Sequence, residues 1–394
     1  MNTAHELILL GGTLGLISVF AGVIGSRFNA PLLLVFLVLG MLAGEDGPGG
    51  FPFADFDAAY LTGSIALAII LFEGGLKTER AMVRLAVWPS LMLATFGVVV
   101  TAGIVAGAAV WLLAIPWNEA LLIGAVLAPT DAAAVNTLLR SARVAIPDRV
   151  TATLEIESGL NDPMSVFLTV TVLEMFTHPE AFGAGHAVIL FLEEMLGGAV
   201  IGLAAGFVLL RLLRKLPLQT SLYPVLAVTC VLVVFGGAQV VGASGFLAVY
   251  LMGLVVGVNQ FEAQRSVTYA AEAFAWLAQI VLFLMLGLLV TPHELVPAVG
   301  TIVIVTAVLV LIARPVATFA SLLPFGYSAR ETAFASWVGL RGAVPIYLTI
   351  IPVLAGSHHA VLLFGITFGV VIVSLVLQGW TIPLAGRILG FGRK

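Results

Sequence analysis

The stretch 157–163 reads Glu-Ser-Gly-Leu-Asn-Asp-Pro and places two carboxylates and an amide inside a segment that is otherwise apolar. The surrounding residues, 149–176, are numerous enough to cross about 30 Å of hydrocarbon as a helix. A carboxylate at the centre of such a helix costs roughly 2.5 to 3.5 kcal/mol to insert, so it marks a functional site by default. Two further ionisable residues, Asp131 and Arg341, also lie within apolar segments. Together with Glu157 and Asp162 they define the candidate site.

The composition indicates an all-α polytopic membrane protein. The 394-residue chain is 61% hydrophobic and only 10% charged, which excludes a soluble domain of this size. Its hydrophobicity is continuous rather than alternating, which excludes a β-barrel. The first apolar segment has no basic stretch before it and is followed by others, so we expect a helix rather than a cleaved signal peptide. We expect a lipid bilayer around the chain and no bound nucleic acid.

About thirteen apolar segments are long enough to serve as transmembrane helices, some of them tilted or shortened. Their predicted cores are 6–25, 30–44, 58–76, 86–114, 118–139, 149–176, 187–213, 220–240, 244–258, 268–290, 295–322, 330–354 and 359–386. Alternate connections carry nearly all of the lysines and arginines, and the other connections carry none. The positive-inside rule therefore predicts an external amino terminus and a cytoplasmic carboxy terminus. Arg314 is expected near the cytoplasmic end of its span, where its side chain can reach the interface.

An internal repeat relates two parts of the chain, about 30–176 and about 244–386. The interval from Gly40 to Gly75 is 35 residues, and that from Gly253 to Gly287 is 34. The same alignment places Asp131 and Arg341 in corresponding spans, the fifth and the twelfth. The two parts enter the membrane from opposite sides, so the repeat is inverted. Inverted repeats with a site at the membrane midplane are typical of secondary transporters.

The fifth and twelfth spans each carry a proline close to a charged residue. Pro129 precedes Asp131 by two positions, and Pro345 follows Arg341 by four. Proline removes a backbone donor and clashes with the preceding turn, so each span is predicted to break into two half-helices. The half-helix ends carry partial charges of about half an elementary charge, which Asp131 and Arg341 are suited to neutralise. The alternative is a simple proline kink.

The sixth span supplies three polar side chains in two directions. Glu157 and Asn161 are four residues apart and share one helix face, whereas Asp162 points about 100° away. We expect Glu157 and Asn161 to hold Arg341, and Asp162 to face a cavity where it alternately binds a proton and a cation. The alternative for Asp162 is a second ion pair with Arg341.

For three other polar residues, the sequence allows two structural roles each. Thr130 and Ser158 flank the acids and offer the oxygen ligands that monovalent cations favour, but such hydroxyls also commonly bond a backbone carbonyl. Glu73 ends the third span on the predicted cytoplasmic side, as a funnel residue or as a solvated helix end.

Three motifs resemble those of the bacterial NhaP-type branch of the monovalent cation:proton antiporters. They are Ala-Pro-Thr-Asp at 128–131, Glu-Ser-Gly-Leu-Asn-Asp at 157–162 and Gly-Leu-Arg-Gly-Ala-Val-Pro at 339–345. The resemblance implies an inner-membrane homodimer with a dimerisation domain, a six-helix core and two broken helices that cross beside the ion site. It implies no enzymatic activity and no cofactor.

The resemblance also implies residue roles. Asp162 would bind the monovalent cation and the proton, and Thr130, Asp131 and Ser158 would line the site. Glu157, Asn161 and Arg341 would form the supporting network, and Glu73 would lie at the cytoplasmic funnel.

The segment 40–77 looks most like the potassium/proton members of that branch, which usually continue into cytoplasmic regulatory domains. This chain ends at Lys394, soon after its last span. We therefore expect no such domain here, because the chain is a truncated transport domain or because this regulation is absent.

The expected function is exchange of K⁺ or Na⁺ for H⁺ by alternating access. Because Asn161 cannot titrate, the exchange is expected to be electroneutral. Two alternatives remain, a cation channel and an intramembrane aspartyl protease. The stretch 159–162 is one residue from the Gly-x-Gly-Asp pattern of such proteases, but Asn161 breaks that pattern, and a protease has no use for Arg341.

Overall fold

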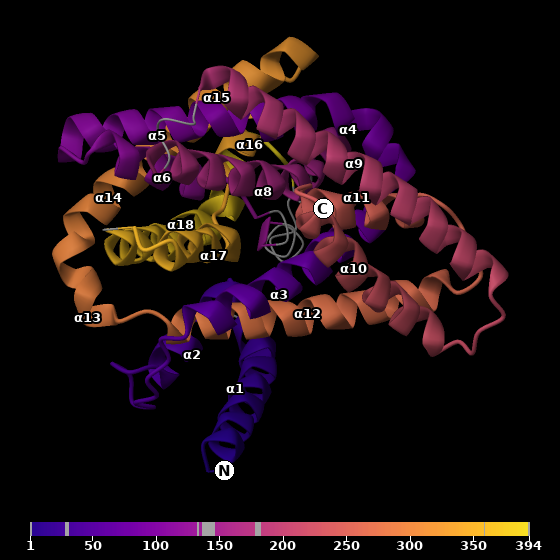
Figure 1. The fold of residues 1–394 in the computed structure, drawn as a ribbon. Coiled ribbons are helices and arrows are strands. Elements are labelled where there is room, and N and C mark those ends of the chain that lie inside the picture. The colour runs from indigo at the N-terminus through magenta and orange to yellow at the C-terminus, as the bar shows by residue number, and fades with distance from the viewer. Residues whose placement is uncertain are drawn as a thin grey trace.

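The computed structural model describes residues 2–27, 31–131, 134–135, 146–177, 183–357 and 359–392. These residues form helices, and the β structure among them is an isolated bridge between Gly44 and Phe51. The α-helices are α1 (Asn2–Arg27), α2 (Leu32–Ala43), α3 (Phe56–Lys77), α4 (Arg80–Met92), α5 (Val98–Leu113), α6 (Trp117–Leu127), α8 (Asp148–Thr177), α9 (Ala184–Lys215), α10 (Leu222–Val240), α11 (Gly245–Gly257), α12 (Gln264–Leu288), α13 (Pro292–Leu295), α14 (Val299–Val308), α15 (Arg314–Leu322), α16 (Ala329–Trp337), α17 (Ala343–Leu354) and α18 (Ala360–Ile388). They form an all-α bundle from which α1 extends (Figure 1).

Each predicted span contains helix in the structure. Among the described residues, seven helices are long and apolar enough to cross a membrane, and five further apolar helices are shorter. The second half of the fifth predicted span, 132–139, falls almost entirely outside the described residues. The number of membrane crossings stays a prediction.

Glycines allow two pairs of helices to approach closely. A Cβ atom on Gly40 of α2 would lie 2.3 Å from a backbone oxygen of α12, and one on Gly287 of α12 would lie 2.3 Å from a backbone oxygen of α2. Gly75 of α3 and Gly253 of α11 have the same relation, at 2.2 Å in both directions. Small residues are what such backbone contacts require. Each pair therefore joins a helix of the first predicted repeat to one of the second.

Two spans contain a π-helical turn in the middle. The turn η1 (Leu93–Gly97) separates α4 from α5, and η3 (Leu309–Ala313) separates α14 from α15. η1 packs against α15, and η3 packs against α5. Such turns widen the helix locally and often occur at functional sites. η3 ends immediately before Arg314.

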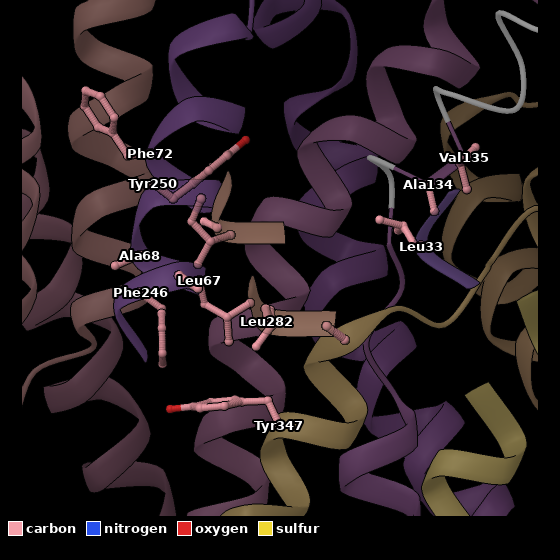
Figure 2. Close-up of a cluster of buried hydrophobic side chains, with 14 of the residues drawn as sticks. Leu33, Leu67, Ala68, Phe72, Ala134, Val135, Phe246, Tyr250, Leu282 and Tyr347 are labelled. Carbon is pink, nitrogen blue, oxygen red and sulfur yellow. The ribbon is translucent and has the colours of Figure 1, made fainter. Parts of the chain in front are cut away.

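Aromatic and aliphatic side chains of α3, α11, α12 and α17 pack together in the core (Figure 2). Tyr347 of α17 stacks on Tyr60 of α3 with ring centroids 5.6 Å apart. Its hydroxyl lies 2.7 Å from the Ser64 hydroxyl. Tyr250 of α11 packs on Gly159 of α8, where an added Cβ would lie 2.2 Å from the ring. These contacts hold α8, which carries site residues, against α11, and α17, which begins two residues after Arg341, against α3.

Candidate ion-binding site

Two non-helical segments lie against each other at the centre of the site. Residues 128–131 follow α6, and residues 338–342 separate α16 from α17. The backbone N–H of Asp131 donates to the carbonyl of Leu340 over 2.8 Å. A Cβ atom on Gly342 would lie 2.0 Å from a carboxylate oxygen of Asp131. Only a glycine at position 342 leaves room for that carboxylate.

Arg341 connects the two segments through its side chain. It is 1% exposed, and its Nη1 donates to the carbonyls of Ala128 at 2.8 Å and Pro129 at 2.7 Å. These carbonyls lie at the carboxyl end of α6, where the helix dipole places negative partial charge. The guanidinium therefore neutralises a helix end, and its Nε and Nη2 have no hydrogen-bond partner.

Glu157 pairs with Arg314, which corrects two expectations from the sequence. Arg314 donates from Nη1 to Oε1 at 2.6 Å and from Nη2 to Oε2 at 2.9 Å. The two side chains are 3% and 0% exposed. Glu157 therefore does not hold Arg341, and Arg314 does not extend to the membrane surface. A two-pronged geometry of this kind is the strongest form of a charged hydrogen bond.

The local backbone explains this pairing. Arg314 directly follows the π turn η3, and its side chain passes over Gly339, where an added Cβ would lie 2.6 Å from Nε. One sequence signal could have predicted it. Arg314 lies eight residues before the end of α15 at Leu322, about 12 Å along the helix axis, which is long for an arginine to reach the interface.

Thr130 is bonded by two residues of α8. Asn161 donates from Nδ2 to the Thr130 hydroxyl at 2.8 Å, and Ser158 donates from its hydroxyl to the Thr130 carbonyl at 2.9 Å. The Thr130 hydroxyl donates to Glu157 over 3.4 Å. Ser158 thus bonds a backbone carbonyl, as the alternative reading expected, but that carbonyl belongs to the non-helical segment. These bonds fix Thr130 against α8, next to Glu157.

Asp162 is placed differently from its neighbours. Its Oδ1 is buried and has no hydrogen-bond partner, and the same holds for Oδ1 of Asn161. The charges of Asp131 and Glu157 are close enough to act on Asp162. Asp131 also caps the chain that follows it, because its Oδ1 accepts from the N–H of Ala134 at 3.0 Å. Buried oxygens without a partner are costly, so this cluster is suited to bind a proton or a cation.

Glu73 takes part in a different group of charges. Its carboxylate lies 2.5 Å from Nζ of Lys77, which also lies 3.1 Å from Glu272 of α12. The Glu73 side chain is 13% exposed, so it is an ion-paired residue between α3 and α12 rather than a solvated helix end. Its role at a cytoplasmic funnel stays a prediction.

Buried and half-buried carboxylates, an amide and hydroxyls lie beside two non-helical segments in a bundle of apolar helices. This combination defines the class of ion-coupled membrane transporters.

The chain belongs to the sodium/hydrogen exchanger family. Residues 15–387 match the family described as "Sodium/hydrogen exchanger, transmembrane". It is 47% identical over 389 residues to the K⁺/H⁺ antiporter NhaP of Alkalimonas amylolytica, covering 99% of this chain and 68% of that protein. It is 42% identical over 389 residues to the K⁺/H⁺ antiporter NhaP2 of Shewanella sp. strain MR-4, covering 98% of this chain and 67% of that protein. The chain thus spans about two thirds of the length of these two relatives.

The fold has a counterpart among solved structures. The sodium proton antiporter MjNhaP1 from Methanocaldococcus jannaschii at pH 8 matches with a TM-score of 0.83 at 22% identity, covering 98% of this chain and 100% of that one. The resemblance inferred from the three motifs is confirmed. The family consists of transporters, so the chain is not an enzyme.

Proposed function

We propose that the protein is a secondary active antiporter that exchanges K⁺ or Na⁺ for H⁺ across a bacterial inner membrane. The observation that carries this proposal is the buried, unpartnered carboxylate oxygen of Asp162 beside two facing non-helical segments. The names of the relatives, which include K⁺/H⁺ antiporters, support the same reaction class.

Asp162 is the group that alternates between a proton and a monovalent cation. Thr130, Asp131 and Ser158 line the site. Glu157, Asn161 and Arg341 form the supporting network, to which we add Arg314 because of its pairing with Glu157. One carboxylate that binds either a proton or a cation couples their movements, since both cannot occupy it at once.

The proposed architecture supports alternating access. It has thirteen crossings, broken fifth and twelfth helices that cross at the site, and inverted repeats over about 30–176 and about 244–386. The reciprocal glycine contacts and the two π turns support that repeat. We also propose a homodimer with a dimerisation domain, an external amino terminus and a cytoplasmic carboxy terminus.

The exchange is electroneutral in this proposal. Asn161 stands beside Asp162 and cannot take up a proton, so one proton moves against one cation. In proteoliposomes with a clamped membrane potential, the exchange rate should not respond to voltage. A rate that follows the voltage would contradict this stoichiometry.

The test of the reaction itself is dequenching of a pH-sensitive dye in acidified proteoliposomes. K⁺, Na⁺ and Li⁺ are added in separate experiments. The cation whose addition drives protons out of the vesicles is the transported one. A cation channel would instead carry cation current without coupled proton movement, and that result would refute the proposal.

A further inference from the structure

Two buried polar residues of α18 hold the interruption between α16 and α17. Ser374 and Gln378 are one helical turn apart, and they are 0% and 1% exposed. Gln378 donates from Nε2 to the carbonyl of Trp337, the last residue of α16, at 2.7 Å. The backbone N–H of Arg341 donates to the Ser374 hydroxyl at 3.2 Å. The Ser374 hydroxyl donates to Oε1 of Gln378 at 2.6 Å, so one bonded pair ties both ends of the interruption.

This pair is connected to the ion site through the backbone at Arg341. The Arg341 side chain donates to the carbonyls of Ala128 and Pro129, and the neighbouring carbonyl of Leu340 accepts from Asp131. A shift of residues 338–342 would therefore move both the guanidinium and the carbonyl that hold residues 128–131. The position of Thr130 and Asp131 thus depends on contacts made by α18.

The other non-helical segment is held in the same manner. Ser158 and Asn161 of α8 lie one turn apart and bond the carbonyl and the hydroxyl of Thr130. In both cases, a side-chain hydroxyl and a side-chain amide on a later long helix form hydrogen bonds with polar groups of the non-helical segment or of the residue next to it. The two α8 residues belong to the proposed site, whereas the α18 pair has no role in it so far.

We propose that Ser374 and Gln378 are positioning residues of the ion site, which set residues 338–342 and, through Arg341, residues 128–131 without touching the cation. Buried backbone groups that lose their partner are costly, so the interruption would rearrange without this pair. The transport test of this inference rests on the proposed function, whereas the amide-exchange test does not.

The first test is hydrogen–deuterium exchange of the purified protein in detergent. The variants Ser374→Ala and Gln378→Leu each remove one bond to the interruption. We expect amide exchange to rise about tenfold in both 338–342 and 128–131, which corresponds to the loss of one buried hydrogen bond. Unchanged exchange, or a rise confined to 338–342, would overturn the inference.

A matched control lies on the same helix. Thr367 is 0% exposed, and its hydroxyl has no hydrogen-bond partner. Thr367→Val therefore removes a buried hydroxyl from α18 without affecting the interruption, and exchange in both segments should stay at the wild-type rate. If Ser374→Ala or Gln378→Leu fails to fold, Gln378→Met replaces it, since methionine keeps the unbranched shape and nearly the length of the side chain but cannot donate to the Trp337 carbonyl.

The second test is the cation dependence of transport in proteoliposomes. We expect Ser374→Ala and Gln378→Leu to raise KM for the transported cation about tenfold, with a smaller change in maximal rate, because the site is displaced rather than emptied. A purely structural role would lower thermal stability and maximal rate but leave KM unchanged, and that result would overturn the inference. If the wild type shows no exchange, the proposed function fails, and the amide-exchange result still decides this inference.

Discussion

Replacement of Arg314 by methionine tests the buried ion pair, which is the main structural difference from the sequence-based prediction. The change leaves the Glu157 carboxylate 0% exposed and without its guanidinium. Removal of one partner of a buried ion pair costs about 3 to 5 kcal/mol, because the remaining charge is uncompensated. We expect the free energy of unfolding of Arg314→Met to fall by that amount.

The assay is reversible unfolding by SDS titration in mixed micelles, carried out as a double-mutant cycle. Glu157→Gln removes the other charge, and the double variant Arg314→Met with Glu157→Gln should recover most of the loss. Replacing both partners by neutral groups of similar size is often close to neutral. The two changes should therefore be strongly non-additive.

A second cycle with Arg341→Met separates the two arginines. The sequence alone assigned Glu157 to Arg341, so on that assignment Glu157→Gln would rescue Arg341→Met. On the structure, Arg341 bonds backbone carbonyls, and the rescue should be specific to Arg314→Met. A loss below about 1 kcal/mol for Arg314→Met, in the range of exposed pairs, would refute the reasoning. Rescue of Arg341→Met instead would refute it as well.

Two further predictions concern single positions. Gly342→Ala places a Cβ atom 2.0 Å from a carboxylate oxygen of Asp131, so exchange in proteoliposomes should be lost. Gly103→Ala, which meets no atom within 4 Å, should keep wild-type exchange, and equal rates in both variants would contradict the predicted clash. Hydrogen bonds from the backbone N–H and the side chain of His293 lower the pKa of Asp46 below its ordinary value of 3.8. A lowered carboxyl pKa stabilises the folded state above that ordinary value, and the contribution is lost as pH falls through the lowered pKa. Thermal melts should therefore show a smaller stability loss from about pH 4 downward in Asp46→Asn than in the wild type, and parallel curves would contradict this.

Local sequence patterns predicted much of the site. The four-residue spacing of Glu157 and Asn161 placed them on one face of α8, and both contact Thr130 in the structure. The motifs at 128–131 and 339–345 drew attention to two segments that are non-helical over 128–131 and 338–342, whereas the broken helices predicted for spans five and twelve stay a prediction. These features depend on helix periodicity and on proline chemistry, which are local properties.

Other parts of the site depend on the tertiary structure. The choice of Arg314 over Arg341 as partner of Glu157 depends on the π turn η3 and on the open space at Gly339. A π turn has no distinct residue pattern, so its effect on side-chain direction cannot be read from the chain. Ser374 and Gln378 are two polar residues, one helical turn apart, in the predominantly apolar helix α18. Their partners, however, are backbone groups 33 and 41 residues earlier in the chain, and these contacts are visible only in the folded molecule.

The measurement that tests the central claim most directly is cation-induced dequenching in proteoliposomes that contain Asp162→Asn. Asparagine has nearly the same size as aspartate but can neither carry a proton nor neutralise a cation. The account predicts that the variant is folded, with the same size-exclusion elution volume as the wild type. It also predicts that the variant exchanges none of K⁺, Na⁺ and Li⁺ for protons. Exchange at the wild-type rate in a folded Asp162→Asn protein would contradict the assignment of Asp162 as the ion carrier.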